Sequence, residues 1–154
     1  MDVLLWRHAH ARDAFPGESD LDRPLTDKGQ RQAEKMARWL NKHMPDDSLV
    51  LCSPAVRTVQ TVQALGQAFT LCEQIKPESS AQALLKACQW PNAPAPVLVV
   101  AHQPFLSETV AVLLGLPATA ALSFRKGALW WLRSQSVNGV METKLLTTQD
   151  PDFL

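Results

Sequence analysis

Short apolar runs alternate with helix-like segments along most of this chain. Residues 3–6, 48–52 and 97–101 are mostly apolar, the pattern of strands buried on both faces of a parallel sheet, and 71–75 predicts a further short strand. Between these runs, apolar residues recur at intervals of three or four, which is typical of helices packed on one side. The predicted helices run from a Thr26 cap to Met44, from Ser53 to about residue 69, over 81–89 and over 105–114.

The pattern changes after residue 120. Residues 121–124 and 128–132 predict a hairpin around Arg125-Lys126-Gly127, and Asn138-Gly139 is a strong turn signal before a strand at 140–146. We expect these strands to extend the sheet at one edge, some of them antiparallel. The whole pattern predicts one mixed α/β domain over residues 1–154.

Composition narrows the class of protein and its partners. The 154 residues are 46% hydrophobic and 19% charged, which suits one globular domain. Fifteen basic and fifteen acidic residues give a formal net charge of +0, so we expect neither a nucleic-acid nor a membrane partner. The three cysteines lack metal-site spacing, no signal-peptide pattern precedes Arg7, and no apolar stretch approaches a membrane span, so we expect a cytoplasmic protein.

Polar side chains follow three of the predicted strands. Arg7 and His8 end the first strand, Arg57 lies one turn into the helix after the second, and His102 ends the strand at 97–101. The carboxyl ends of parallel strands meet at one edge of a sheet, and helices begin there with free N–H groups. Two guanidinium groups and two imidazoles at such an edge predict a binding site for a small dianion, and we expect phosphate.

The same residues suggest a reaction. An imidazole held through its second nitrogen by a backbone carbonyl can attack phosphorus and form a phosphohistidine, while the other cationic groups stabilise the transferring phosphoryl oxygens. This chemistry needs no metal and no cofactor. His8 and His10 form an HxH pair that is also found in metal hydrolases, but those enzymes use a barrel of about 250 residues, so we expect His10 at the pocket rim. Ser53 is expected to cap a helix, because no nucleophile-elbow motif surrounds it.

Four segments resemble the motifs of the histidine phosphatase superfamily, also called phosphoglycerate mutase-like. The matching residues are Arg7-His8-Ala9 for RHG, Arg23-Pro24-Leu25-Thr26 with Gly29, Gln32 and Ala33 for RPLTxxGxxQA, Ser53-Pro54, Arg57 and Gln60-Thr61 for SPxxRxxQT, and Ala101-His102-Gln103-Pro104 for GHxP. They occur in the family's order and span most of the chain. Because the chain is short and lacks a large helical insertion, it is most similar to the SixA-type phosphohistidine phosphatases.

The resemblance implies a fold and a set of roles. The fold would be a three-layer α/β/α sandwich with a mostly parallel central sheet. His8 would be the nucleophile, and Arg7, Arg57 and His102 would bind phosphate. The implied activity is a metal-independent phosphatase that acts on phosphohistidine in a protein. The alternatives are a phosphatase of small phosphomonoesters, and a catalytically weak phosphate-binding regulatory module, because Ala9 replaces the family's glycine.

The general acid is left open. Larger family members use a glutamate between the second helix and the fourth strand, where Glu78 is the best-placed candidate and Glu73 the next. SixA-like members lack a clear equivalent, which makes physical sense because an imidazole leaving group needs less help from a proton than an alkoxide does. In the long polar segment 9–25, Arg12, Asp20, Asp22 and Arg23 are either solvated charges or rim contacts that position Arg7.

Overall fold

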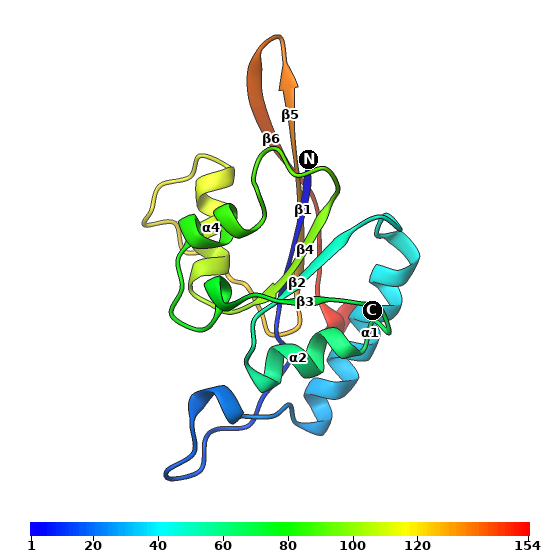
Figure 1. Cartoon of the computed structure of the whole chain (residues 1–154), viewed down its shortest axis with the longest axis vertical. Helices are drawn as coiled ribbons and strands as arrows, with labels where there is room; N and C mark the ends of the chain where they lie inside the picture. Colours follow the sequence, from blue (N-terminus) through cyan, green and yellow to red (C-terminus); the bar gives the residue numbers. More distant parts are fainter.

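A six-stranded mixed sheet runs through the middle of the computed structural model, which describes residues 1–154 (Figure 1). Its strands are β1 (Asp2–Arg7), β2 (Leu49–Cys52), β3 (Thr70–Leu71), β4 (Val97–Ala101), β5 (Leu129–Val137) and β6 (Val140–Gln149), in the order β3-β2-β4-β1-β5-β6. The first four strands pair in parallel, whereas β5 runs antiparallel to β1, and β6 to β5. The prediction of a mostly parallel sheet with an antiparallel edge is confirmed.

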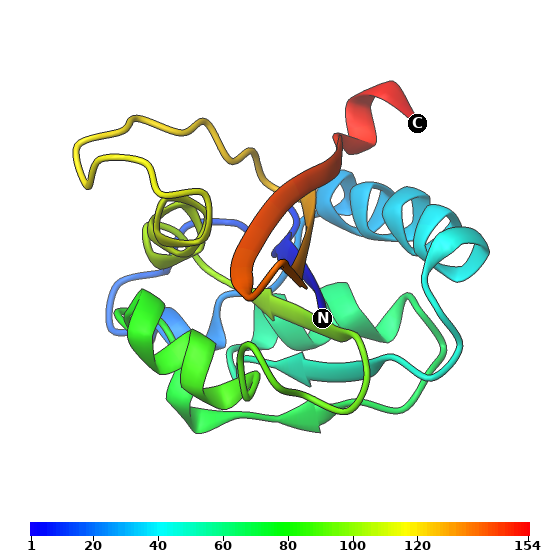
Figure 2. The ribbon, with the colours of Figure 1, turned by 90° about the horizontal axis from the view of Figure 1, so that it is seen from above.

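Helices cover both faces of this sheet (Figure 2). The elements are α1 (Asp27–His43), α2 (Val56–Gln63), α3 (Ala81–Ala87) and α4 (Phe105–Leu113), with 3-10 turns η1 (Asp20–Asp22), η2 (Glu73–Ile75) and η3 (Pro151–Phe153). α1 and α2 pack on one face, and α3 and α4 on the other, so the predicted three-layer α/β/α sandwich is confirmed. None of these helices combines the length and the apolar character that crossing a bilayer requires.

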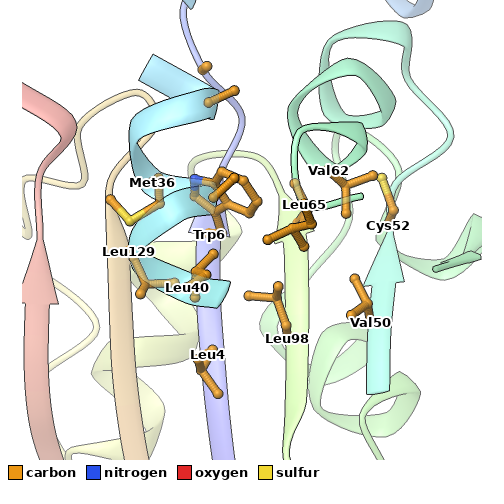
Figure 3. Packing of buried hydrophobic residues seen from close by; sticks show 14 of the residues in the cluster. Leu4, Trp6, Met36, Leu40, Val50, Cys52, Val62, Leu65, Leu98 and Leu129 are labelled. Atoms are coloured by element: carbon orange, nitrogen blue, oxygen red, sulfur yellow. The ribbon is translucent and has the colours of Figure 1, made fainter. Parts of the chain in front are cut away.

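The core explains why β1 reads as a continuous apolar run. Leu4 and Trp6 belong to a cluster of 18 buried residues under α1 and α2, where Met36 also packs (Figure 3). Val3 and Leu5 belong to a second cluster of 15 buried residues on the α3 and α4 face. Since both faces of the strand are covered, alternate residues are equally apolar.

The predicted hairpin over residues 121–132 is wrong in its first half. Residues 121–124 form no strand, and Phe124 instead stacks on Trp130 with ring centroids 5.5 Å apart. The backbone carbonyl of Phe124 accepts a hydrogen bond from Arg7 at 2.8 Å. Residues 121–124 therefore lie near the carboxyl end of β1 and do not pair with residues 128–132. The hairpin signalled by Asn138-Gly139 is confirmed and joins β5 to β6.

Two other boundaries differ from the prediction. α2 ends at Gln63 rather than near residue 69, and Gly66 then adopts a φ of +66°, a conformation that ends helices and favours glycine. The predicted strand at 71–75 is reduced to β3, because residues 73–75 form the η2 turn that buries Ile75. The apolar residues of that run therefore belong partly to a turn. A pattern of only five positions does not distinguish such a turn from a strand.

Candidate active site

Three strand ends meet at one edge of the sheet, because β2, β4 and β1 are adjacent and parallel. The His8 N–H donates to the carbonyl of Ala101 at 3.1 Å, and the Ser53 N–H donates to that of Val100 at 3.0 Å. The imidazole rings of His8 and His102 consequently lie with centroids 5.3 Å apart. The expected convergence of these two histidines is present in the structure.

The ring of His8 is held in one orientation. Its Nδ1 lies 2.8 Å from the backbone oxygen of Ala9, and a carbonyl oxygen can only accept, so Nδ1 carries the proton. The Nε2 atom of the neutral ring therefore keeps its lone pair. His8 is only 6% exposed, which means that its ring is largely removed from water. This is the geometry expected of a nitrogen nucleophile.

Arg57 is held by the loop between β1 and α1. Its two terminal nitrogens donate to the backbone oxygen of Asp20 at 2.7 Å and to the Asp20 carboxylate at 3.0 Å. The same carboxylate accepts from Nε of Arg23 at 2.9 Å. The Asp20 side chain is 58% exposed, whereas that of Arg57 is 4% exposed. Asp20 is one of the charged residues predicted as a rim contact, and it positions Arg57 rather than Arg7.

Several buried polar nitrogens at this edge have no partner within the protein. Nε of Arg7, Nε of Arg57 and Nδ1 of His102 are all buried and make no hydrogen bond. Unsatisfied buried polar groups are costly, so a cluster of them indicates a group that binds there. Two of the three belong to permanently charged guanidinium groups, which fit the oxygens of a phosphate. The site is therefore suited to an oxyanion.

Ser53 has a different place from the one predicted. α2 begins at Val56 with Ala55 at its N-cap, and no side chain caps it. The Ser53 hydroxyl instead lies 2.7 Å from Nε2 of His102. It is fully buried, so it orients this imidazole and leaves Nδ1 as the nitrogen for a ligand. The prediction of a helix cap is wrong because the strand end requires a partner for His102.

Ala9 stands where the RHG motif that this segment resembles has glycine, and the structure shows how it fits. The φ of Ala9 is negative, so this position does not require the backbone freedom of glycine. Its side chain is fully buried in the cluster beneath α1 and α2. Its N–H donates to the Thr61 hydroxyl at 3.0 Å, which in turn donates to the carbonyl of Arg57. Ala9 therefore couples the end of β1 to α2.

The remaining motif residues fasten the loop that starts at His10. Thr26 caps α1 by accepting from the Gly29 N–H and also lies 2.7 Å from Nδ1 of His10. Gln32 accepts from the His10 N–H at 2.9 Å, and Gln60 accepts from the Leu25 N–H at 2.7 Å. These contacts give the family-like residues between the charged positions a structural role. His10 is partly exposed and is held by α1.

Burial and neighbouring cations shift the ionisation of the site. Burial, followed by the charges of Arg57 and Arg7, lowers the pKa of His8 to about 3. Burial, followed by His8 and Arg57, lowers the pKa of His102 to about 2. Both imidazoles are therefore neutral at pH 7, which preserves the nucleophilic lone pair of His8. Burial also lowers the pKa of Arg7, with a contribution from Arg57.

Glu78 lies apart from this network. It is exposed in the turn before α3, with a φ of +69°, and no hydrogen bond or ion pair joins it to the residues above. Its role as a general acid stays a prediction. His, Cys, Asp and Glu side chains nowhere gather in a group of three or more that could hold a metal ion.

The comparisons with known proteins agree with this architecture. Residues 3–80 match the family model of the histidine phosphatase superfamily (branch 1), and the chain belongs to this family. It is 33% identical over 122 residues to the phosphohistidine phosphatase SixA of Escherichia coli (strain K12), a match that covers 73% of this chain and 74% of that protein.

Solved structures show the same likeness over nearly the full length. The protein histidine phosphatase SixA complexed with tungstate superposes with a TM-score of 0.82 and 26% identity, covering 99% of each chain. A SixA structure from Agrobacterium tumefaciens gives a TM-score of 0.81 and 28% identity, covering 97% of each chain. A protein named as a SixA homologue in Haemophilus influenzae is 32% identical over 130 residues, covering 75% of this chain and 78% of that protein.

Proposed function

We propose that this protein is a metal-independent phosphatase that acts through a phosphohistidine intermediate on His8. The observation that carries the proposal is the state of the His8 ring. The carbonyl of Ala9 holds Nδ1, so Nε2 is an unprotonated nucleophile, and the same edge of the sheet carries three buried nitrogens that have no partner. A tungstate ion, which resembles phosphate in shape and charge, is bound by a similar SixA protein. That binding supports an oxyanion site in this fold.

In the first step, Nε2 of His8 attacks phosphorus in line and forms a P–N bond, while the bond from phosphorus to the leaving group breaks. Arg7, Arg57 and His102 hold the phosphoryl oxygens, and the charges of the two guanidinium groups offset the negative charge in the transition state. The leaving group takes a proton from solvent or from an acid. In the second step, water attacks phosphorus, the P–N bond breaks, and His8 and orthophosphate are released.

The substrate we propose is phosphohistidine carried by another protein. Relatives named phosphohistidine phosphatase support this class, and so does the chemistry of the leaving group. An imidazole accepts its proton easily and needs no strong acid, whereas an alkoxide does. Glu78, the candidate acid, is exposed and makes no hydrogen bond or ion pair with His8 or the residues around it. Small phosphomonoesters are the second class of substrate and would require that acid.

The proposal treats residues 1–154 as one histidine phosphatase domain that works in the cytoplasm. The three cysteines are free and buried, which suits a reducing compartment.

The test is a comparison of two substrates with a trap for the intermediate. A phosphohistidine peptide and p-nitrophenyl phosphate are each incubated with the protein, with and without EDTA, and the quenched protein is analysed for an acid-labile phosphoryl group on His8. We expect turnover of the peptide, no effect of EDTA, and a phosphoenzyme that is absent in His8→Ala. Full activity of His8→Ala would refute the mechanism, and turnover abolished by EDTA would favour a metal enzyme.

A third outcome would favour the regulatory alternative. Phosphate binding without turnover and without a phosphoenzyme would identify a binding module. We expect activity instead. The methyl group of Ala9 is buried in the core, and the backbone of Ala9 does not have the positive φ that would require glycine.

A further inference from the structure

The outer edge of β6 is a long strand edge with no partner. β6 is the last strand of the sheet, and it pairs only with β5 (Figure 1). An open edge of this kind presents a row of backbone donors and acceptors that can pair with another strand. Proteins often protect such edges with a bulge or a charge, and β5–β6 does have a register shift beside Leu132. Residues 140–145 lie before that irregularity and are regularly paired.

The turn determines which backbone groups point outward. Val137 and Val140 flank the two-residue turn, and in such hairpins the flanking residues exchange hydrogen bonds with each other. Because the pattern alternates along an antiparallel pair, Met141, Thr143 and Leu145 direct their N–H and C=O groups away from β5. The free edge therefore offers three equally spaced sets of backbone donors and acceptors, with Thr143 at the centre.

We propose that β6 pairs antiparallel with β6 of a second copy of this chain, about a two-fold axis at Thr143. In this register, Glu142 of each copy lies directly opposite Lys144 of the other. Thr143 faces its own counterpart and exchanges two backbone hydrogen bonds with it, and Met141 and Leu145 do the same with each other. A C2 interface requires such self-complementarity. In this segment each residue on one side of Thr143 is matched by a suitable partner on the other side.

The charges on this edge have no partner within their own chain. Neither Glu142 nor Lys144 makes an ion pair, and Lys144 lies across from Arg133 on β5. Arg133 is itself paired with Asp2, so Lys144 has no carboxylate partner in its own sheet, and a carboxylate from the second copy would supply one. Two such pairs form at once, one on each side of the axis. This arrangement favours a copy of the same strand over an unrelated one.

The apolar side chains of β6 match in the same register. Val140 is 64% exposed, Met141 51%, Leu145 41% and Leu146 42%. Met141 would lie opposite Leu145, on the same face of the sheet as Leu132. These two apolar side chains from each copy would thus lose part of their contact with water, which is the main favourable term in association.

Pairing at β6 leaves the candidate active site open. β5 runs antiparallel to β1, so the hairpin extends past the amino end of β1, opposite the edge that carries His8 (Figure 1). In an antiparallel dimer the two candidate sites face away from each other. The inference does not depend on the proposed function, and variants of β6 are expected to keep the activity of the wild-type protein.

The experiment is a charge exchange in the full chain, measured by sedimentation velocity over a range of protein concentrations. We expect a concentration-dependent dimer for the wild type. Glu142→Lys or Lys144→Glu alone places like charges opposite each other twice, and each should weaken dimerisation about tenfold. The double variant Glu142→Lys/Lys144→Glu should restore it. An equimolar mixture of the two single variants should form heterodimers, because each variant supplies the charge that the other lacks.

A matched control is Glu34→Lys, which makes the same charge change at an exposed position on α1 and should leave the dimer unaffected. A wild-type protein that stays monomeric at every concentration would overturn the inference. So would a dimer that both single variants leave intact, since its contacts would then lie elsewhere.

Discussion

At the scale of single residues, the site depends on groups that hold the phosphate-binding residues in place. Asp20 binds the side chain of Arg57, and Ser53 binds that of His102. Thr61 donates to the backbone carbonyl of Arg57. None of the three would touch the phosphoryl group in the proposed mechanism. Their substitution should therefore separate positioning from binding.

Asp20→Asn removes the charge that fixes Arg57 while keeping the shape of the side chain. We expect kcat to fall about tenfold, because a less constrained guanidinium is poorly placed in the transition state. Inorganic phosphate should inhibit as well as before or better, since a negative charge beside the pocket is lost. Asp22→Asn, in the same η1 turn, is the control and should change neither quantity. Equal losses in kcat and in phosphate binding would contradict this division.

Ala9→Gly restores the residue that the family has at this position. Because Ala9 already has negative φ and a buried methyl group, activity should stay within about twofold of wild type. The free energy of unfolding should fall by about 1 kcal/mol, from the lost burial and the added freedom of the unfolded chain. Urea unfolding and steady-state kinetics measure the two effects. A large gain in activity would mean that the methyl group hinders phosphate.

At the scale of elements, the contact between α1 and the loop after β1 leaves no space for a side chain at Gly29. A Cβ placed there would lie 2.0 Å from the carbonyl oxygen of His10. That distance is far inside van der Waals contact, and the obstacle is backbone rather than a flexible side chain. The glycine of this motif therefore lets α1 approach the strand end.

Gly29→Ala should consequently push the loop at His10 away from α1. We expect a loss of about 1–3 kcal/mol in stability, seen as a fall in Tm of about 3–10 °C. We also expect a fall in activity, because His8 lies only two residues before the displaced His10. Gln30→Ala, at the next and exposed position, should cost little. Equal Tm values for the two variants would show that the loop yields without strain.

At the scale of the whole molecule, the pH dependence of stability reports the two buried imidazoles. Their pKa values, about 3 and about 2, are lower than in an unfolded chain, so the folded protein binds fewer protons than the unfolded one below about pH 6.5. Stability is therefore full above that pH and is lost as the pH falls. Between about pH 6.5 and pH 5 each imidazole should remove about 2 kcal/mol.

This range separates the histidines from the carboxylates, whose lowered pKa values matter only nearer pH 4 and below. His8→Asn should therefore lose about 2 kcal/mol less than wild type between about pH 6.5 and pH 5, as measured by urea unfolding at each pH. A variant with the same pH dependence as the wild type would show that His8 is not held neutral.

The sequence by itself determined the layers and the edge where the site lies. Apolar runs buried on both faces predicted β1, β2 and β4, helical spacing predicted α1 and α4, and Arg7, His8, Arg57 and His102 marked the strand ends. These features are local, because burial sets the spacing of apolar residues within each element and strand direction sets where each element ends.

Only the tertiary structure decided which groups hold the site together. Asp20 meets Arg57 across 37 positions, and Ser53 meets His102 across 49, while residues 121–124 leave the expected strand to bind Arg7. The physical reason is that these contacts depend on the paths of irregular loops and on which buried donors need a partner. The spacing of apolar residues along the chain predicts neither the loop paths nor the partners of the buried donors, and both depend on the complete fold.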